Sequence, residues 1–302
     1  MPGILFTERN MAALLVFAAF LAAPLGAREL KSGVTGSLDW ERMRIDAELS
    51  VNLDEDVIRP PSGRTQAEEK LFSEYFDSVQ PLILSIRLDS STVIGDLINS
   101  GEIPPSLIDA LTLRAERKPP KYSLDFRTIS SSFTIDLKDI ASRFAGHGES
   151  ARIAHLVNPA PVAEYTGIII IAEDELPVHG RKGSAALTPC LFPKIWDTGM
   201  NLIYDRGMTR PGWEAGFSMV HYTGAENIFK GGPSGLSESL RQVVGDKPLR
   251  IIARGVFGIN PTDPVIDRED AVTILSSEVN RRLLNEGRVA FIVRQDALGE
   301  QF

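Results

Sequence analysis

The sequence contains very little cysteine: Cys190 is the one cysteine among 302 residues. A single cysteine cannot form an internal disulfide, so the fold has to be stabilised by its apolar core. Unpaired cysteine usually behaves in proteins as a small buried apolar residue. We therefore expect Cys190 to be buried and unreactive rather than a nucleophile.

Histidine is also scarce, and its spacing does not match a metal site. The four histidines are far apart in the chain, and none belongs to a His-Glu-x-x-His motif or to another close ligand pattern. They are His147, His155, His179 and His221. The sequence therefore predicts no metal site.

The short motifs of acyl and phosphate chemistry are missing as well. Gly232–Gly235 resembles a Gly-x-Ser-x-Gly elbow only superficially, and Pro233 and Ser234 fit the start of a helix better. Lys230–Gly232 lacks the lysine and hydroxyl pattern of a phosphate-binding loop. We expect no catalytic and no cofactor-binding residues. A catalytic triad or carboxylate pair built from distant residues has no linear signature, so a hydrolase remains the alternative.

Two groups of acids have a structural interpretation. Acids that gather before a helix favour its N-terminus, and EF-hand spacing for calcium is absent. We therefore expect helix capping from Asp263, Asp267, Glu269 and Asp270. Asp54–Asp56 is expected in a solvated loop.

Positive charge is in deficit. The chain has 32 Lys and Arg against 40 Asp and Glu, a formal net charge of −8. Nucleic-acid binding requires a concentrated basic surface. The composition therefore predicts no nucleic-acid partner.

The one long apolar run is Met11–Leu25, which is short for a membrane-spanning helix. Small residues follow it at Gly26 and Ala27. This arrangement is typical of a secretory signal peptide, with residues 1–27 removed after Ala27, and a retained anchor is the alternative. No cysteine stands at this position to carry a lipid. We expect an exported protein in the periplasm or associated with the outer membrane.

Apolar periodicity predicts two lobes. In the first, residues 28–150, strict alternation over Met43–Val51 predicts a half-buried strand within Leu38–Val51. A possible capping box at Thr65 and Glu68 starts a helix whose apolar face includes Phe72, Tyr75, Phe76 and Val79, and Pro81 should kink it or end it near Gln80. Its apolar face should pack on the predicted strand. Further elements are expected as helices at 93–99, 106–114 and 138–145, and two strands around a turn at 129–131.

The second lobe, residues 160–302, follows a polar boundary segment. Thr166–Ala172 predicts a strand buried on both faces, and 173–184 a polar loop. Phe192–Asp205 predicts a hairpin around Asp197–Met200. Later elements are expected as a helix at 234–244, a strand at 249–256, a helix from Asp267 to about Leu284, and a strand at 288–293. The pattern predicts an α+β fold of two α/β lobes, each a small mixed sheet covered by helices.

Several segments resemble the FlgP-type and LPP-type bacterial envelope lipoprotein family and its relatives. They are Gly36–Leu49, the helix at Ala67–Val79, Ile86–Leu97, Tyr165–Val178, Ala186–Asp205 and Asp263–Leu275. The resemblance implies an envelope protein, in some members part of rings around the flagellar motor, with no enzymatic activity.

These observations lead to one hypothesis and one alternative. The hypothesis is an exported, non-enzymatic envelope protein with a structural or assembly role. Association with the flagellum is one form that this role could take. Its partners would be envelope or flagellar-motor proteins, together with self-association through the Phe192–Asp205 hairpin edge. The alternative is a periplasmic hydrolase.

Overall fold

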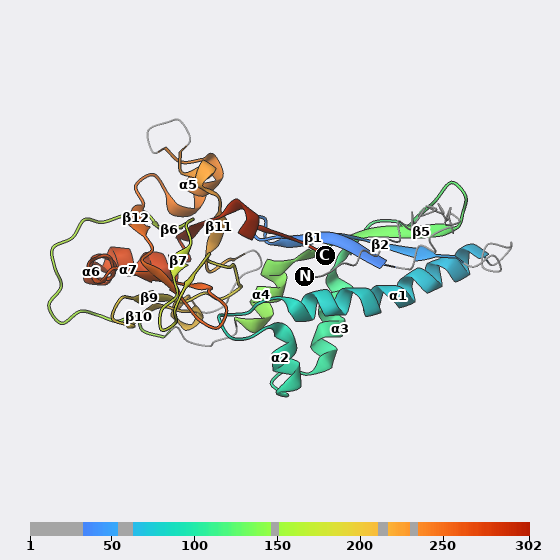
Figure 1. Cartoon of the computed structure of the whole chain (residues 1–302), viewed down its shortest axis with the longest axis horizontal. Helices are drawn as coiled ribbons and strands as arrows, with labels where there is room; N and C mark the ends of the chain where they lie inside the picture. Colours follow the sequence, from blue (N-terminus) through green and yellow to red (C-terminus); the bar gives the residue numbers. More distant parts are fainter. Residues whose placement is uncertain (1–32, 54–62, 146–150, 211–216, 230–234) are drawn as a thin grey trace, which may run out of the picture. The chain divides into compact units, whose positions relative to one another are not determined.

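The computed structural model describes residues 33–53, 63–145, 151–210, 217–229 and 235–302. The expected α+β fold in two lobes is confirmed, with helices packed on small sheets in each lobe (Figure 1). Three sequence-based expectations lie outside the described residues. They are the signal segment with cleavage after Ala27, the acidic loop Asp54–Asp56, and the Lys230–Gly232 segment with Pro233 and Ser234.

The first lobe is built on an antiparallel sheet. β1 (Gly33–Asp39), β2 (Arg44–Asn52) and β5 (Thr128–Asp136) form its centre. β3 (Glu116–Arg117) and β4 (Lys121–Tyr122) pair with the outer side of β5. The other edge is β16 (Gly299–Gln301), which pairs with β1 although it comes from the far end of the chain.

The predicted alternation of Met43–Val51 is present, because Ile45, Ala47, Leu49 and Val51 are all buried. Leu38–Val51 is nevertheless two strands rather than one. Met43, at φ 55°, belongs to the tight connection between β1 and β2. Gly36 allows these strands to approach, since a Cβ there would lie 2.5 Å from the Ala47 Cβ.

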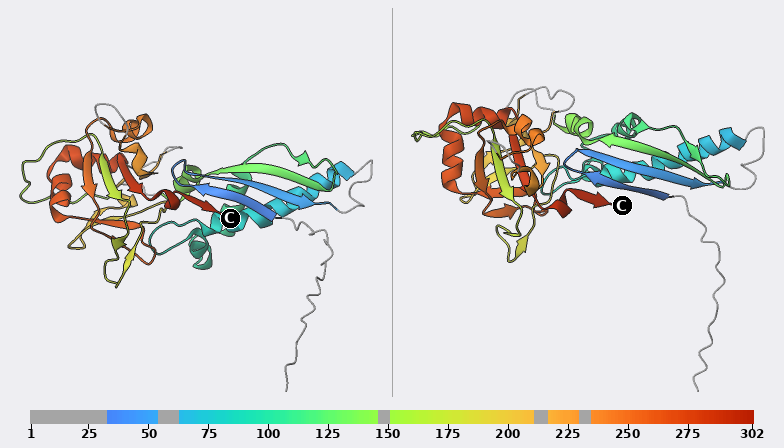
Figure 2. Two further views of the ribbon diagram at one scale, coloured as in Figure 1. Left: turned by 45° about the horizontal axis from the view of Figure 1, so that its top comes forward. Right: turned by 90° about the horizontal axis from the view of Figure 1, so that it is seen from above.

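α1 (Gly63–Ser85) lies along one face of this sheet (Figures 1 and 2). Its buried side chains recur every four residues, which places one stripe of the helix in the core. They are Ala67, Leu71, Tyr75, Val79 and Ile83.

For α1, the predicted capping box is wrong, and of the two alternatives given for Pro81, a kink or an end near Gln80, the end is wrong. The helix does not end near Gln80, because Pro81 is exposed and the buried residues Val79 and Ile83 on either side anchor the helix to the core. The capping box is not formed either: Thr65 lies inside the helix, and Glu68 accepts a hydrogen bond from Arg64 at 2.9 Å.

α2 (Ile94–Asn99), α3 (Pro105–Arg114) and α4 (Leu137–Phe144) occupy the predicted ranges. The predicted turn at 129–131 is wrong, since these residues lie within β5. The chain turns at 123–127, where Asp125 accepts hydrogen bonds from the Ser123 hydroxyl at 2.6 Å and the Arg127 amide at 3.1 Å. Leu124, within this turn, is fully exposed.

The second lobe contains a parallel sheet in the order β11 (His221–Thr223), β15 (Val289–Val293), β6 (Ile168–Ala172), β12 (Leu249–Ile252). As predicted, β6 is a central strand, and most of its residues are buried. α5 (Glu238–Val244) begins after Ser237, whose hydroxyl accepts a hydrogen bond from the Leu240 amide.

A second sheet follows the order β10 (Leu202–Tyr204), β9 (Ile195–Asp197), β14 (Asp263–Ile266), β13 (Gly255–Phe257). β9 and β10 form the predicted hairpin. The predicted loop at 173–184 contains the start of a small hairpin, β7 (Leu176–Pro177) with β8 (Ser184–Ala185). The strand expected at 249–256 is divided between β12 and β13, which belong to different sheets.

The helix expected from Asp267 to Leu284 is two helices, α6 (Arg268–Ser276) and α7 (Glu278–Asn285). Ser277 is extended and its hydroxyl caps α7. The break places the Asn280 amide in the interior, where its Nδ2 donates to the carbonyl oxygens of Ala163 and Thr273. Within the described ranges, no helix has both the length and the apolar character to cross a membrane.

Candidate functional site: a basic aromatic groove and its framework

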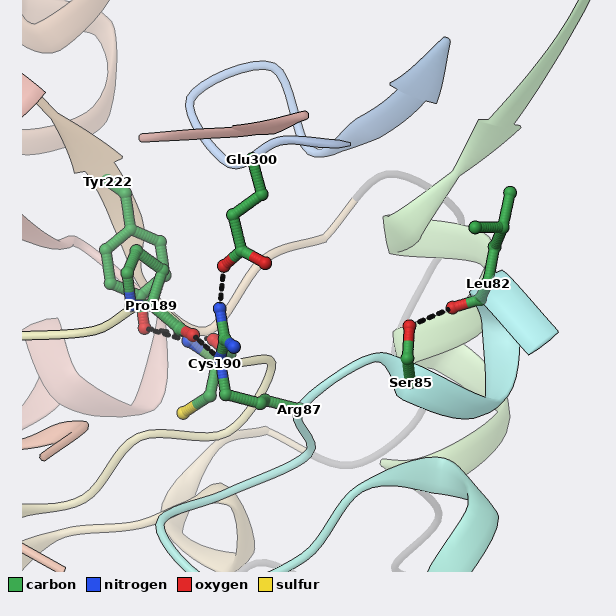
Figure 3. Close-up of polar contacts among 7 residues, drawn as sticks. All are labelled: Leu82, Ser85, Arg87, Pro189, Cys190, Tyr222 and Glu300. Carbon is green, nitrogen blue, oxygen red and sulfur yellow. Dashed lines mark hydrogen bonds and ion pairs between the residues drawn. The ribbon is translucent and has the colours of Figure 1, made fainter. Parts of the chain in front are cut away.

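Arg87, which precedes α2 in the sequence, contacts three separate parts of the chain, and Figure 3 shows two of these contacts, with Pro189 and Glu300. Its guanidinium forms an ion pair with Glu300 of β16, and its Nε donates to the carbonyl oxygen of Pro189 at 3.1 Å. The same guanidinium lies 6.0 Å from the ring centroid of Trp40. Arg87 therefore fixes both the end of the chain and the segment before Cys190 against the first sheet.

Cys190 is buried, as predicted, and its backbone is held by Tyr222 of β11 (Figure 3). The Tyr222 hydroxyl accepts from the Cys190 amide at 3.2 Å and donates to the Cys190 carbonyl at 2.9 Å. Burial raises the pKa of the Cys190 thiol well above its ordinary value. A protonated, inaccessible thiol has none of the properties of a nucleophile.

Aromatic rings continue this framework. The ring of Tyr222 packs edge-on against Trp40, at 6.0 Å between centroids, and against Phe291, at 5.8 Å. Trp40 and Phe291 are completely buried. These contacts form structural core, with no surface open to a ligand.

The four acids expected to cap a helix have different roles. Asp263 lies in β14, fully buried, and accepts hydrogen bonds from the Lys194 amide, the Trp196 Nε1 and the Thr262 hydroxyl. Burial raises its pKa. Asp267 does stand at the N-cap of α6, but its carboxylate pairs with Arg254 at 2.6 Å instead of capping. Glu269 and Asp270 lie in the first turn of α6.

The described histidines are dispersed. His155 is exposed, His179 lies edge-on to Phe257, and His221 is partly buried in β11, while His147 lies outside the described residues. Burial, with the positive charge of Lys138, lowers the pKa of His221 to about 4. Among the described residues, no three potential metal ligands gather at one place.

The most distinctive open feature of the first lobe is a groove of about 560 Å³ between α1 and the β3–β4 edge. Its floor is apolar, with Leu49, Leu71 and Tyr75. Phe72 is 47% exposed at its border, although the α1 pattern predicted that this ring would pack on β2. Of the other residues expected to pack there, Tyr75 and Val79 are buried and Phe76 is half-buried.

Arg117 of β3 is held over this groove by two rings. Its guanidinium carbon lies 5.1 Å from the ring centroid of Phe72 and 5.1 Å from that of Tyr75. Burial raises the pKa of Tyr75 to about 12, so its hydroxyl stays protonated and donates to the Thr112 carbonyl at 3.0 Å. Lys118 adds a second positive charge at the rim, and the one acid of the lining, Glu68, is paired with Arg64 at 2.9 Å. We name the set Leu49, Leu71, Phe72, Tyr75, Arg117 and Lys118 the Phe72 groove.

Sequence reasoning missed the Phe72 groove because its residues come from β2, α1 and β3. Phe72 has the same helical spacing as the buried residues of α1, so its exposure has no signal in the periodicity. The Arg117-Lys118-Pro119-Pro120 run was the one local sequence feature from which the basic rim of the groove could have been predicted.

Comparison with protein families identifies two segments of the chain. Residues 31–143 match the family model of Treponema pallidum Tp0624, N-terminal domain. Residues 167–295 match that of Treponema pallidum Tp0624, second domain. No curated protein matches the sequence.

The expected resemblance to the FlgP-type and LPP-type lipoprotein family is wrong, because the matching families are those of Tp0624. The segments that suggested it, such as Gly36–Leu49 and Tyr165–Val178, form strands and turns. Strands buried on one face have alternating apolar residues, and strands buried on both faces have continuous apolar runs, whatever their family. Short segments of this kind therefore do not distinguish families.

Proposed function

We propose that this chain, which is similar to the N-terminal and second domains of Treponema pallidum Tp0624, is an exported envelope protein with a structural role. In this proposal the Phe72 groove holds a segment of another envelope protein. The observation that carries the proposal is the exposed Phe72 ring beside an apolar floor, with Arg117 stacked above it. Aromatic and arginine side chains at an apolar depression are the typical anchors of protein interfaces.

The chemistry of the groove favours an acidic, apolar segment as the occupant. Neither Arg117 nor Lys118 forms an ion pair with another described side chain. A guanidinium stacked on rings still presents its N–H edge, which matches a carboxylate. One large apolar side chain on the floor and one carboxylate at Arg117 would satisfy both parts of the groove.

Strand addition is the less suitable mode of binding at this edge. β3 and β4 contain two residues each, and Pro119 and Pro120 separate them. Proline has no amide hydrogen to donate, and short edge strands are poor templates for pairing. The occupant is therefore held by its side chains, as in recognition by a groove.

A crosslinking experiment tests the proposal in the native envelope. A photo-reactive phenylalanine analogue is placed at position 72, with position 113 as matched control, because Leu113 is an exposed apolar residue of α3. We expect one defined adduct with an envelope protein from position 72 and none from position 113. Arg117→Glu should abolish that adduct, because it repels an acidic segment.

Two results would contradict this function. The first is an adduct that persists unchanged with Arg117→Glu, since the cationic rim would then contribute nothing. The second is equal crosslinking from positions 72 and 113, which indicates random collision. The fold of each variant is checked by circular dichroism, and Phe72 and Arg117 are exposed, so neither substitution removes core packing.

A further inference from the structure

A second concave site lies where β2 begins and β5 ends, between the last turn of α3 and the first turn of α4. Its volume is about 390 Å³, within the range of small-molecule sites. Leu111, Ile135 and Ile140 are buried and line its apolar part. This site, the charged pocket, includes neither Phe72 nor Arg117, so it is distinct from the Phe72 groove.

Three arginines and three acids surround the apolar part of the charged pocket. They are Arg42, Arg44 and Arg114, with Glu116, Asp136 and Asp139. All six side chains are exposed or half-buried, so a charge among them that has no protein partner is accessible to water and to a ligand. The charge pairing within the pocket therefore decides what it can bind.

Three of these groups already have partners. Arg42 pairs with Asp39 at 3.7 Å, and Arg44 pairs with Asp46 at 2.6 Å. The Asp136 carboxylate accepts a hydrogen bond from the Lys138 amide at 2.8 Å, which caps α4. These contacts point to groups beside the pocket, and the Asp136 carboxylate keeps its negative charge because the amide that it binds is neutral. The other three charged groups of the pocket have no such partner.

Arg114, Glu116 and Asp139 form no ion pair within 4.0 Å with any described side chain. The helix dipoles favour two of these charges at their positions, since a cation is stabilised in the last turn of a helix and an anion in the first turn. Arg114 lies in the last turn of α3 and Asp139 in the first turn of α4. No helix dipole stabilises the charge of Glu116, because this residue lies in β3. One cation and two anions thus border one apolar depression without meeting each other.

We propose that the charged pocket binds a free basic amino acid in its cationic form. A carboxylate of the ligand pairs with Arg114, and two ammonium groups pair with Glu116 and Asp139. The methylene chain between the ammonium groups lies on the apolar part formed by Leu111, Ile135 and Ile140. Such a ligand has one carboxylate and two ammonium groups, which matches the one cation and the two anions of the pocket that form no ion pair.

Titration calorimetry with the full chain at low ionic strength tests this assignment. The probes are L-lysine, cadaverine, which lacks the carboxylate, and norleucine, which lacks the side-chain ammonium. We expect saturable binding of lysine, and binding about tenfold or more weaker for each truncated probe, because each loses one charged hydrogen bond.

Single substitutions identify the residues that contact the ligand. Arg114→Gln should weaken lysine binding about tenfold and leave cadaverine binding unchanged, since cadaverine has no carboxylate to lose. Asp139→Asn should weaken lysine and cadaverine alike. The matched controls are Arg143→Gln, on the exposed side of α4, and Asp77→Asn, on the exposed side of α1, and both should bind lysine as the parent does.

The proposal is overturned if lysine gives no saturable heat at millimolar concentration. It is also overturned if lysine, cadaverine and norleucine bind equally, or if Arg114→Gln binds lysine as tightly as Arg143→Gln does. The probe series uses the unmodified chain, so a variant that fails to fold does not prevent the test. None of these three outcomes depends on the Phe72 groove.

Discussion

The Tyr222 hydroxyl satisfies both backbone polar groups of Cys190, accepting from its amide at 3.2 Å and donating to its carbonyl at 2.9 Å. Tyr222 belongs to β11, in the parallel sheet, and Cys190 follows the segment that Arg87 holds. One side chain therefore connects a strand of the second lobe to the segment in contact with the first.

Tyr222→Phe should lower the free energy of unfolding by about 1–3 kcal/mol, because it leaves buried backbone groups without partners. Denaturant unfolding measures this loss. Cys190 should also become more reactive toward iodoacetamide, since its backbone is no longer fixed, whereas the parent thiol stays unlabelled. Tyr122→Phe, at a more exposed tyrosine that donates to the Arg64 carbonyl at 3.3 Å, is the matched control and should have little effect.

His221 should make the protein acid-sensitive. Its pKa is about 4 in the folded chain, against about 6.5 in an unfolded chain. The unfolded state therefore binds the proton first, and stability present above about pH 6.5 is lost as the pH falls towards 4, by at most about 1.4 kcal/mol per pH unit. Because the ring is partly exposed, the loss should be smaller than this limit.

His221→Gln should flatten the dependence of stability on pH between about 6.5 and 4. His155→Gln serves as control, because His155 is exposed in a loop. Thermal unfolding midpoints of the three proteins across this range provide the measurement. Parallel curves for the parent and His221→Gln would show that other groups cause any acid sensitivity.

Gly36→Ala should separate β1 from β2. A Cβ at position 36 would lie 2.5 Å from both the Ala47 Cβ and the Asp46 carbonyl oxygen, so the strands have to move. We expect a loss of about 1–3 kcal/mol. Gly36 also exchanges two backbone hydrogen bonds with Phe302, at 3.2 and 3.1 Å. Faster hydrogen exchange at β16 should accompany the loss, and Ser37→Ala should produce neither effect.

Alanine substitutions of Phe72 and Tyr75 should differ in their effect on the free energy of unfolding, although the two residues are only three positions apart on α1. Tyr75→Ala should cost about 3–5 kcal/mol, because the ring is buried against Phe133 and its hydroxyl is bonded to Thr112. Phe72→Ala should cost less than about 1 kcal/mol, since the ring is 47% exposed. Urea unfolding of both variants decides whether Phe72 belongs to the core or to a binding surface.

Periodicity predicted the elements whose side chains alternate between core and solvent. The burial of Ile45, Leu49 and Val51 in β2, and of β6 at the centre of its sheet, follows directly from the apolar pattern. α1 was found for the same reason. Its continuation past Pro81 could not be read from the sequence, because it depends on the core contacts of Val79 and Ile83.

The two candidate sites could not be predicted, since neither is local. The Phe72 groove requires that one ring of an amphipathic helix stays exposed, which depends on where β3 lies. The charged pocket combines residues of β2, α3, β3, β5 and α4. The resemblance to the FlgP-type and LPP-type family was wrong for a related physical reason, since strand-like segments carry burial patterns that many unrelated folds share.

The pairing of β16 with β1 has a consequence for biosynthesis. Synthesis proceeds from the N-terminus, so β1 emerges long before residues 299–301, which cover its edge. Throughout that interval the backbone amides and carbonyls on one side of β1 have no partner strand, and exposed edges of this kind attract other chains. Nascent protein should therefore need a holding chaperone until residues 299–301 arrive, and truncation just after Leu298 should favour aggregation over release of a soluble product.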